Sequence, residues 1–249
     1  AHMKKALDGS RDKNLMRTLH ASIQKECAAA LHCTIAHYCS RLGDVKTALK
    51  HLCRAEKRAQ SSTTQAHTLL LRAEILIESP EAAEQSAMEA GVLVETAAEM
   101  LSKRPEDVGR ELHFTLEYLR STLAIGSWTE ASDLAKVEED RDSLEGVFQQ
   151  ANGTVCDILL QSKFAVLRGH CRYRHGMLDP SITVAMVDLS INILGRAHGV
   201  VNAYGDIRME LKVLRGLERG YLAAQSREKV AQASLTIMRN REKRLAEAV

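Results

Sequence analysis

The chain has few of the residues that interrupt helices and few of the signals that accompany β-sheets. It contains three prolines and 4% aromatic residues among 249, and β-branched alternation bounded by Asn-Gly turns is almost absent. Apolar residues still make up 45% of the chain, so Leu, Ala, Val and Ile must form the core. Because Ala and Leu favour helices and little interrupts them, we expect an all-α fold.

Other absences exclude classes of function. The 34 basic and 32 acidic residues give a net charge of +2, too balanced for the basic footprint of a nucleic-acid-binding protein. No run approaches the roughly 18 apolar residues of a membrane span, so no membrane partner is expected. Nucleophile elbows, acid dyads and phosphate-cradling glycine loops are also missing. We therefore expect no enzyme and no cofactor.

The six cysteines stand at helical spacings on apolar faces. They predict reduced, buried thiols and hence a cytoplasmic or nuclear protein. Cys33 and His37 are four residues apart, as are Cys171 and His175, so each pair shares a helix face. Together they could supply four zinc ligands. Without a CxxC or HxxEH pattern, we interpret them as core thiols beside surface imidazoles and expect no metal site.

Start and stop signals divide the chain into about 9–11 helices. Asp44 and Asp206 are expected caps, Ser62 with Gln65 a capping box, and Asn152-Gly153 a turn. Residues 195–205, rich in glycine, predict a loop or a distorted helix. The expected helices cover residues 12–41, 44–59, 62–78, 80–103, 105–125, a short helix from 127 that breaks around 140–142, 154–175, 179–194, 206–224 and 226–247.

One turn signature occurs twice, as residues 43–48 (GDVKTA) and 126–131 (GSWTEA). In each copy Gly is followed two residues later by a large apolar residue and five residues later by Ala. Each copy follows one amphipathic stretch and opens another, and Ser127 with Glu130 would form a capping box for the second. A helix pair with a tight Gly turn and a small residue at the crossing is the repeating unit of an α-solenoid.

On these turns the chain resembles a divergent tetratricopeptide-repeat (TPR) protein, built from helix-turn-helix units of about 34 residues. The copies are unevenly spaced and lack the family's Trp and Leu-Gly pair. The resemblance implies a right-handed α-solenoid of antiparallel helix pairs over residues 4–249, with a C-terminal capping helix at about 226–247. Residues 1–3 (AHM) are interpreted as a cloning scar. The matching positions are Gly43, Ala48, Leu52 and Ala55, then Gly126, Trp128, Ala131 and Ala135, and in a weaker third copy Gly176, Leu178 and Ser181.

In TPR proteins the first helix of each pair lines a concave groove that holds a peptide or a partner helix. Such a face, here basic and containing His, fits an acidic or amphipathic protein segment whose carboxylates Arg side chains grip. Cys33 and His37 replace the Lys and Asn of the family's chaperone-binding clamp, so that clamp is not expected. The transferred groove positions are His37, Ser40, Arg41, His113, Leu116, Arg120, Lys163, His170, Tyr173 and Arg174.

The resemblance implies a non-catalytic protein–protein interaction scaffold. Similarity of residues 42–55 to helical-repeat subunits of the proteasome lid and the COP9 signalosome leaves a structural subunit of a large assembly as an alternative. A third alternative is an RNA- or phosphate-binding module at the basic run 168–175, although the charge balance argues against nucleic acid. Trp128 is interpreted as inter-helix core packing rather than an interface anchor.

Overall fold

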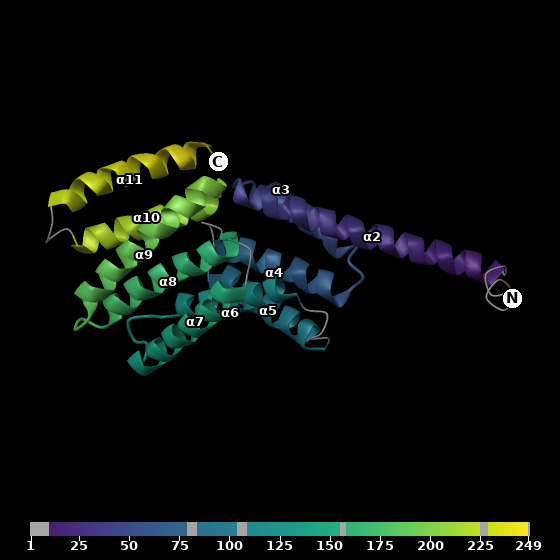
Figure 1. Ribbon diagram of the computed structural model, residues 1–249, viewed down its shortest axis with the longest axis horizontal. Coiled ribbons are helices and arrows are strands. Elements are labelled where there is room, and N and C mark those ends of the chain that lie inside the picture. Colours follow the sequence, from purple (N-terminus) through teal and green to yellow (C-terminus); the bar gives the residue numbers. More distant parts are fainter. Residues whose placement is uncertain (1–9, 79–83, 104–108, 155–157, 225–228, 249) are drawn as a thin grey trace.

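The computed structural model describes residues 10–78, 84–103, 109–154, 158–224 and 229–248, and most of them are helical. These residues form ten helices and no strand, which confirms the all-α fold (Figure 1). The helices are α2 Ser10–Arg41, α3 Val45–Glu56, α4 Ser62–Glu78, α5 Glu84–Ser102, α6 Arg110–Gly126, α7 Leu134–Thr154, α8 Ile158–Leu178, α9 Thr183–Tyr204, α10 Ile207–Ala224 and α11 Lys229–Ala248.

The helices pack as neighbours along the chain, from α2 on α3 to α10 on α11. A second set of contacts joins alternate helices, α2 to α4, α4 to α6, α6 to α8 and α8 to α10. We call these five the inner helices. The last of them, α10, also contacts α2, so the C-terminal end of α2 lies beside the start of α10 (Figure 1). Adjacent helix packing of this kind is compatible with a helical-repeat protein.

The first turn signature folds as expected. Gly43 takes a φ of 86°, a left-handed conformation that glycine adopts without steric cost. Asp44 then caps α3, because its Oδ1 accepts a hydrogen bond of 3.0 Å from the backbone N–H of Thr47. Ala48 and Leu52, one turn apart on α3, are fully buried. They pack in one core cluster with Cys33 and Ala36 of α2.

The second signature does not form the same turn. Gly126 is the last residue of α6 and has no positive φ. Ser127 donates its hydroxyl to the carbonyl of Ala124, which ends α6 instead of capping a new helix. The next helix, α7, begins only at Leu134, where the carboxylate of Asp133 accepts the cap hydrogen bond. The expected helix start and capping box at Ser127 are therefore wrong.

The weaker third copy is also wrong as a turn, since Gly176 lies inside α8. A Cβ at Gly176 would approach the Cβ of Met186 to 2.7 Å. This glycine therefore allows α9 to lie directly on α8. Ala131 of the second copy is exposed instead of standing at a helix crossing.

Three expected interruptions are absent from the structure. The helix α7 continues through residues 140–142 and through Asn152-Gly153, and α9 continues through residues 195–204. Helix propensity is a weak preference that packing overrides, and α7 buries Val137, Leu144 and Ala151 at spacings of seven residues. The end of α9 is Gly205, with a φ of 65°.

Other expected caps shift or lie outside the described residues. The hydroxyl of Ser61, one residue before the expected Ser62, accepts a 3.1 Å bond from the N–H of Thr64 at the start of α4. Asp206 caps α10 as expected, accepting from the N–H of Met209 at 2.9 Å. The expected starts at 79–81, 105–107 and 226, the expected cap at 154–157 and residues 1–3 include or adjoin positions outside the described ranges.

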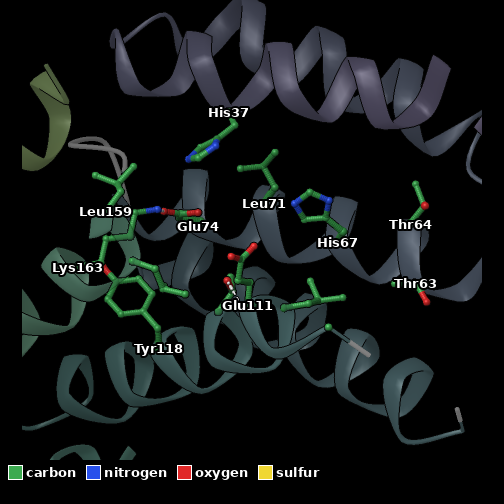
Figure 2. A pocket seen from close by; sticks show the side chains of 14 residues that line it. His37, Thr63, Thr64, His67, Leu71, Glu74, Glu111, Tyr118, Leu159 and Lys163 are labelled. Atoms are coloured by element: carbon green, nitrogen blue, oxygen red, sulfur yellow. Dashed lines mark hydrogen bonds and ion pairs between the residues drawn. The ribbon is translucent and has the colours of Figure 1, made fainter. Parts of the chain in front are cut away.

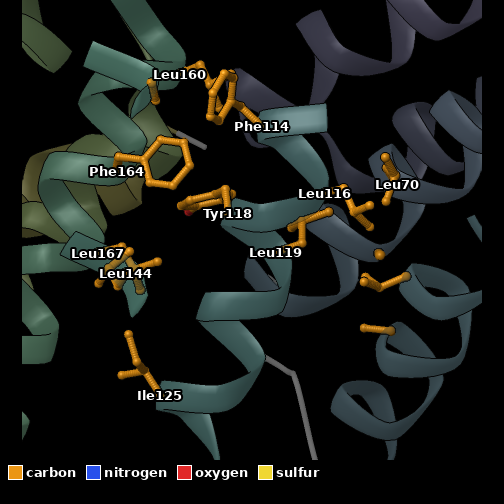
Figure 3. Packing of buried hydrophobic residues seen from close by; sticks show 14 of the residues in the cluster. Leu70, Phe114, Leu116, Tyr118, Leu119, Ile125, Leu144, Leu160, Phe164 and Leu167 are labelled. Atoms are coloured by element: carbon orange, nitrogen blue, oxygen red, sulfur yellow. The ribbon is translucent and has the colours of Figure 1, made fainter. Parts of the chain in front are cut away.

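The largest core cluster joins α4 to α8. Tyr118 of α6 and Phe164 of α8 are both fully buried and meet edge to face, with ring centroids 5.6 Å apart (Figure 3). Edge-to-face contact adds to the stabilisation that burial of each ring gives. Smaller clusters hold α2 to α3 and α4, and α8 to α9 and α10. The core thus runs along the whole array.

Among the described helices, α9 alone is long and apolar enough to cross a membrane by length and composition. It packs between α8 and α10. The hydroxyl of Ser190 donates a 2.7 Å hydrogen bond to the carbonyl of Gly169 on α8, and Leu194 is fully buried. These contacts hold α9 against α8, while 28% of its apolar 18-residue window is buried.

The two turn glycines should respond oppositely to alanine. Gly43→Ala should lower the free energy of unfolding by about 1–2 kcal/mol, because a Cβ disfavours the left-handed conformation. Gly126→Ala should leave it unchanged or raise it by up to about 1 kcal/mol, because Gly126 is helical and its Cβ would meet nothing within 4 Å. Urea denaturation followed by circular dichroism measures both. Equal losses would contradict the difference between the two turns.

Trp128 packs in the core as expected and is 5% exposed. Its indole N–H also donates a 3.0 Å hydrogen bond to the carboxylate of Asp140 on α7. Trp128→Ala should therefore cost about 3–5 kcal/mol, as large-to-small core substitutions do. Tyr38→Ala is the control, since Tyr38 is 60% exposed. A Trp128→Ala protein that melts with the wild type would contradict the core assignment.

Candidate functional site

The inner helices enclose a buried ion pair between Glu74 of α4 and Lys163 of α8 (Figure 2). The residues are 6% and 7% exposed, and the ammonium donates a hydrogen bond to the carboxylate. Burial alone would raise the pKa of Glu74, but the charges of Lys163 and His37 outweigh it and hold this pKa below the usual range. Burial alone would lower the pKa of Lys163, but the charges of Glu74 and Glu78 outweigh burial and raise this pKa. Both groups are therefore charged at neutral pH.

A cavity of about 440 Å³ opens beside this pair, between α2, α4, α6 and α8. Figure 2 shows His37 of α2 above it, Glu74 and Lys163 at one end, and His67 of α4 toward the other. Its lining includes Glu111 of α6 as a second carboxylate. Its basic and acidic groups are mixed, so this first cavity has no marked preference for either sign of charge.

A second set of polar contacts holds α2 to α10. Arg41 donates a 2.6 Å hydrogen bond to the carbonyl of Tyr204 and lies 3.6 Å from the carboxylate of Asp206. Arg208 of α10 donates to the hydroxyl of Ser40, which is buried. Ser40 and Arg41, two of the expected groove residues, therefore connect the first inner helix, α2, to the last, α10.

Glu78 lies one helical turn beyond Glu74 on α4. Arg208 is its cationic neighbour, at 3.9 Å. Burial, followed by the charge of Glu74, raises the pKa of Glu78. Its Oε1 is buried without a hydrogen-bond partner among the described residues. Glu78 also forms part of the wall of a second cavity.

This second cavity is strongly basic, and we call it the basic cavity. It has a volume of about 370 Å³, and Glu78 is the only acidic residue that lines it among those described. Its other walls are apolar, formed by residues such as Ile77, Ile125 and Leu167. Its cationic residues are Arg174 of α8 and Arg208, Lys212, Arg215 and Arg219 of α10.

Three of the five cations already have partners. Besides the contacts of Arg208 described above, Arg174 donates to the carbonyl of Ile125 in the last turn of α6 and to that of Trp128 beyond the helix end. Arg215 forms a 2.6 Å ion pair with Glu242 of α11.

Lys212 and Arg219 have no ion pair with any residue that the structure describes. Burial lowers the pKa of Lys212 and outweighs the charges of Glu78 and Glu74, which raise it. Beside them, burial and the charges of Lys212 and Arg219 lower the pKa of His170 to about 3, so this imidazole is neutral. Its buried Nε2 has no hydrogen-bond partner among the described residues.

Four of the ten expected groove residues line the two cavities: His37 and Lys163 the first, and His170 and Arg174 the basic cavity. Ser40 and Arg41 lie in the contact between α2 and α10 instead.

The positions transferred from Gly126 lie elsewhere. Leu116 is a core residue, and Arg120 forms a 2.8 Å ion pair with Glu95 of α5. His113 is exposed on the α5 side of α6. The register fails here because Gly126 does not form the turn from which the offsets were taken. Tyr173 lines neither cavity.

Sequence reasoning missed the cations of α10. Their signal is the spacing of Arg208, Lys212, Arg215 and Arg219, in steps of four, three and four residues. Such steps place four positive charges on one face of a helix. The acidic partners Glu74 and Glu78 carry no comparable signal, since an i, i+4 pair of carboxylates is common on exposed helices.

The basic run 168–175 is divided between two sides of α8. Arg168 and Arg172 turn toward α7, where both pair with Glu145, at 2.7 Å and 3.5 Å. His170 and Arg174 instead line the basic cavity. The run therefore does not form one continuous surface for RNA.

The two Cys-His pairs also lie apart. Cys33 packs in the cluster of α2, α3 and α4, and its thiol is 3.3 Å from the hydroxyl of Thr68. Cys171 belongs to the core between α4 and α8, where burial raises the pKa of its thiol to about 12. No group of three or more potential metal ligands occurs within the described part of the chain.

Comparison with known proteins finds no matching family model, no matching curated protein and no matching solved structure.

The buried pair should be costly to break singly and tolerant of joint replacement. Glu74→Gln should lower the free energy of unfolding by about 3–5 kcal/mol, because it leaves Lys163 charged and unpaired in the interior. The double variant Glu74→Met, Lys163→Met should lie within about 2 kcal/mol of wild type or be more stable. Glu95→Gln is the exposed control and should cost at most about 1 kcal/mol. Urea denaturation at pH 7 measures all three.

The pH dependence of this contribution follows from the two pKa shifts. The lowered pKa of Glu74 stabilises the fold above its ordinary value of 4.5, and this part is lost as the pH falls. The raised pKa of Lys163 stabilises it below 10.5, and this part is lost as the pH rises. The free energy of unfolding of wild type should thus exceed that of Glu74→Gln most between pH 4.5 and pH 10.5. A difference that is independent of pH would contradict the charged pair.

Proposed function

We propose that the protein is a non-catalytic interaction scaffold that binds an acidic or amphipathic segment of a partner protein at the basic cavity. In this proposal the helices form a divergent, TPR-like, right-handed solenoid of antiparallel pairs, and the protein acts in the cytoplasm or nucleus. The adjacent packing of the helices and the row of inner helices support this architecture.

The observation that carries the proposal is the composition of the basic cavity. Five Arg and Lys side chains face one carboxylate in a chain whose net charge is only +2. Positive charge so concentrated attracts anions and speeds their association. The apolar walls would bury the aliphatic part of an amphipathic segment and strengthen charge–charge contacts by excluding water. Guanidinium groups hold carboxylates through paired hydrogen bonds and do not give up their protons, which suits binding rather than catalysis.

The test uses a fluorescein-labelled hexaglutamate peptide and fluorescence anisotropy at low salt. Lys212→Glu with Arg219→Glu should weaken binding by at least about tenfold, because charge reversal repels the carboxylates. Lys50→Glu with Arg196→Glu changes the net charge equally at two exposed positions outside the cavity and should leave binding close to wild type.

Equal weakening by both double variants would show that only the overall charge matters. It would contradict the basic cavity as the binding site. A hexalysine peptide that bound as well as hexaglutamate would contradict the preference for acidic segments.

A structural role in a large multiprotein assembly is the second candidate. The observation that favours it is a row of apolar side chains on α2, where Leu19, Ile23, Leu31 and Tyr38 are each more than half exposed. Exposed apolar residues aligned on one helix are typical of a subunit contact. Sedimentation analysis distinguishes this alternative. The charge reversal in the basic cavity should leave the assembly intact, whereas Leu19→Lys with Ile23→Lys should abolish the assembly.

A further inference from the structure

We propose that the basic cavity recognises a dianionic phosphate group, held by Lys212, Arg219 and Arg174 beside the neutral ring of His170. This inference rests on the proposed function for its location. It specifies the anion, which the proposed function leaves as a general acidic segment. The phosphate would be carried on a phosphorylated side chain of the partner or on a free phosphate monoester.

The first argument is that cationic groups converge on one imidazole. Lys212, Arg219 and Arg174 all lie close enough to His170 for their charges to lower its pKa. Gly216 of α10 faces the same ring, and a Cβ there would come within 2.7 Å of its Cε1. The helix α10 therefore lies directly against His170, with Lys212 one turn before Gly216 and Arg219 almost one turn after it.

The second argument is that the cations of this cavity outnumber its carboxylates among the described lining residues. The pKa of Arg174 is lowered by burial and then by the charge of Arg219. Glu78 lies 3.9 Å from Arg208 and its charge also raises the pKa of Lys212, and Glu242 is already paired with Arg215. Lys212 and Arg219 thus remain without an ion pair among the described residues. A phosphate dianion brings two negative charges and several acceptor oxygens to one point, which a single carboxylate does not.

The third argument concerns the shape of the site. A volume of about 370 Å³ is suited to one phosphorylated group with a short attachment. No aromatic side chain other than the His170 imidazole is among the described lining residues, so the cavity lacks the stacking platforms on which single-stranded nucleic acid depends. The site therefore favours an isolated phosphate over a nucleic-acid strand.

Isothermal titration of the full chain with inorganic phosphate tests the inference, with sodium chloride at equal ionic strength as the reference. We expect saturable phosphate binding that is absent with chloride. Lys212→Gln with Arg219→Gln should weaken it at least about tenfold, because both unpaired cations are removed. Lys50→Gln with Arg196→Gln, the matched control, should bind as wild type does.

Thermal melting provides an independent readout and shows whether the variants fold. Without phosphate, Lys212→Gln with Arg219→Gln should show a cooperative melting transition, which establishes that the variant folds. With phosphate, wild type should gain melting temperature through ligand binding and the variant should not. Phosphate binding that is equal in wild type and in the Lys212, Arg219 variant would overturn the inference.

Two further arms identify the source of the phosphate. A degenerate library of phosphoserine peptides that binds more tightly than inorganic phosphate indicates a phosphorylated partner, and equal affinity indicates a free monoester. A poly(U) strand that binds more tightly than either would overturn the inference in favour of RNA. Hexaglutamate that binds but is not displaced by phosphate would leave the proposed function standing and refute the inference. Phosphate binding without hexaglutamate binding would support the inference and refute the binding of acidic segments in the proposed function.

Discussion

The buried ion pair between Glu74 and Lys163 is the constraint on which the inner part of the structure depends. It joins α4 to α8 through charges that water would otherwise solvate, so neither charge is tolerated without the other. The negative charge of Glu74 is also one reason why Glu78, one turn away, has a raised pKa. The two carboxylates thereby separate a first cavity of mixed charge from a basic one. One face of α4 thus supplies a carboxylate to each cavity.

The contact between α2 and α10, the first and the last inner helix, explains how an almost neutral chain has a strongly basic cavity. Ser40 and Arg41 at the end of α2 bind Arg208, Asp206 and the carbonyl of Tyr204, which holds the start of α10 in place. The remaining cations of α10 then line the basic cavity, where Lys212 is half-buried and Arg215 and Arg219 are exposed. Elsewhere acidic partners neutralise the basic residues, as Glu145 does for Arg168 and Arg172. Local concentration of charge, not net charge, is the basis of the proposed function.

Successive helices pack in a way that is compatible with a helical-repeat protein, and one of the turn signatures folds as expected. At Gly43 the positive φ, the cap by Asp44 and the buried Ala48 occur together. The second copy has a similar sequence but folds differently. There the segment after α6 is long enough for Trp128 to fold into the core, and its carbonyl, beyond the helix end, binds Arg174. Three small motifs of similar sequence therefore gave one correct turn.

The sequence by itself determined the helices, most of their boundaries and the caps at Asp44 and Asp206. Helices and caps depend on apolar periodicity and on hydrogen bonds between residues a few positions apart, and the local sequence indicates both. Four of the positions that it indicated by resemblance, His37, Lys163, His170 and Arg174, line the cavities. Only the tertiary structure decided that α7 and α9 run unbroken, because packing of residues such as Leu144 and Leu194 outweighs the local preference for a turn. It also decided which cations find partners and which do not, because Lys163 meets Glu74, and Arg208 meets Ser40, across separations in the chain that no local pattern encodes.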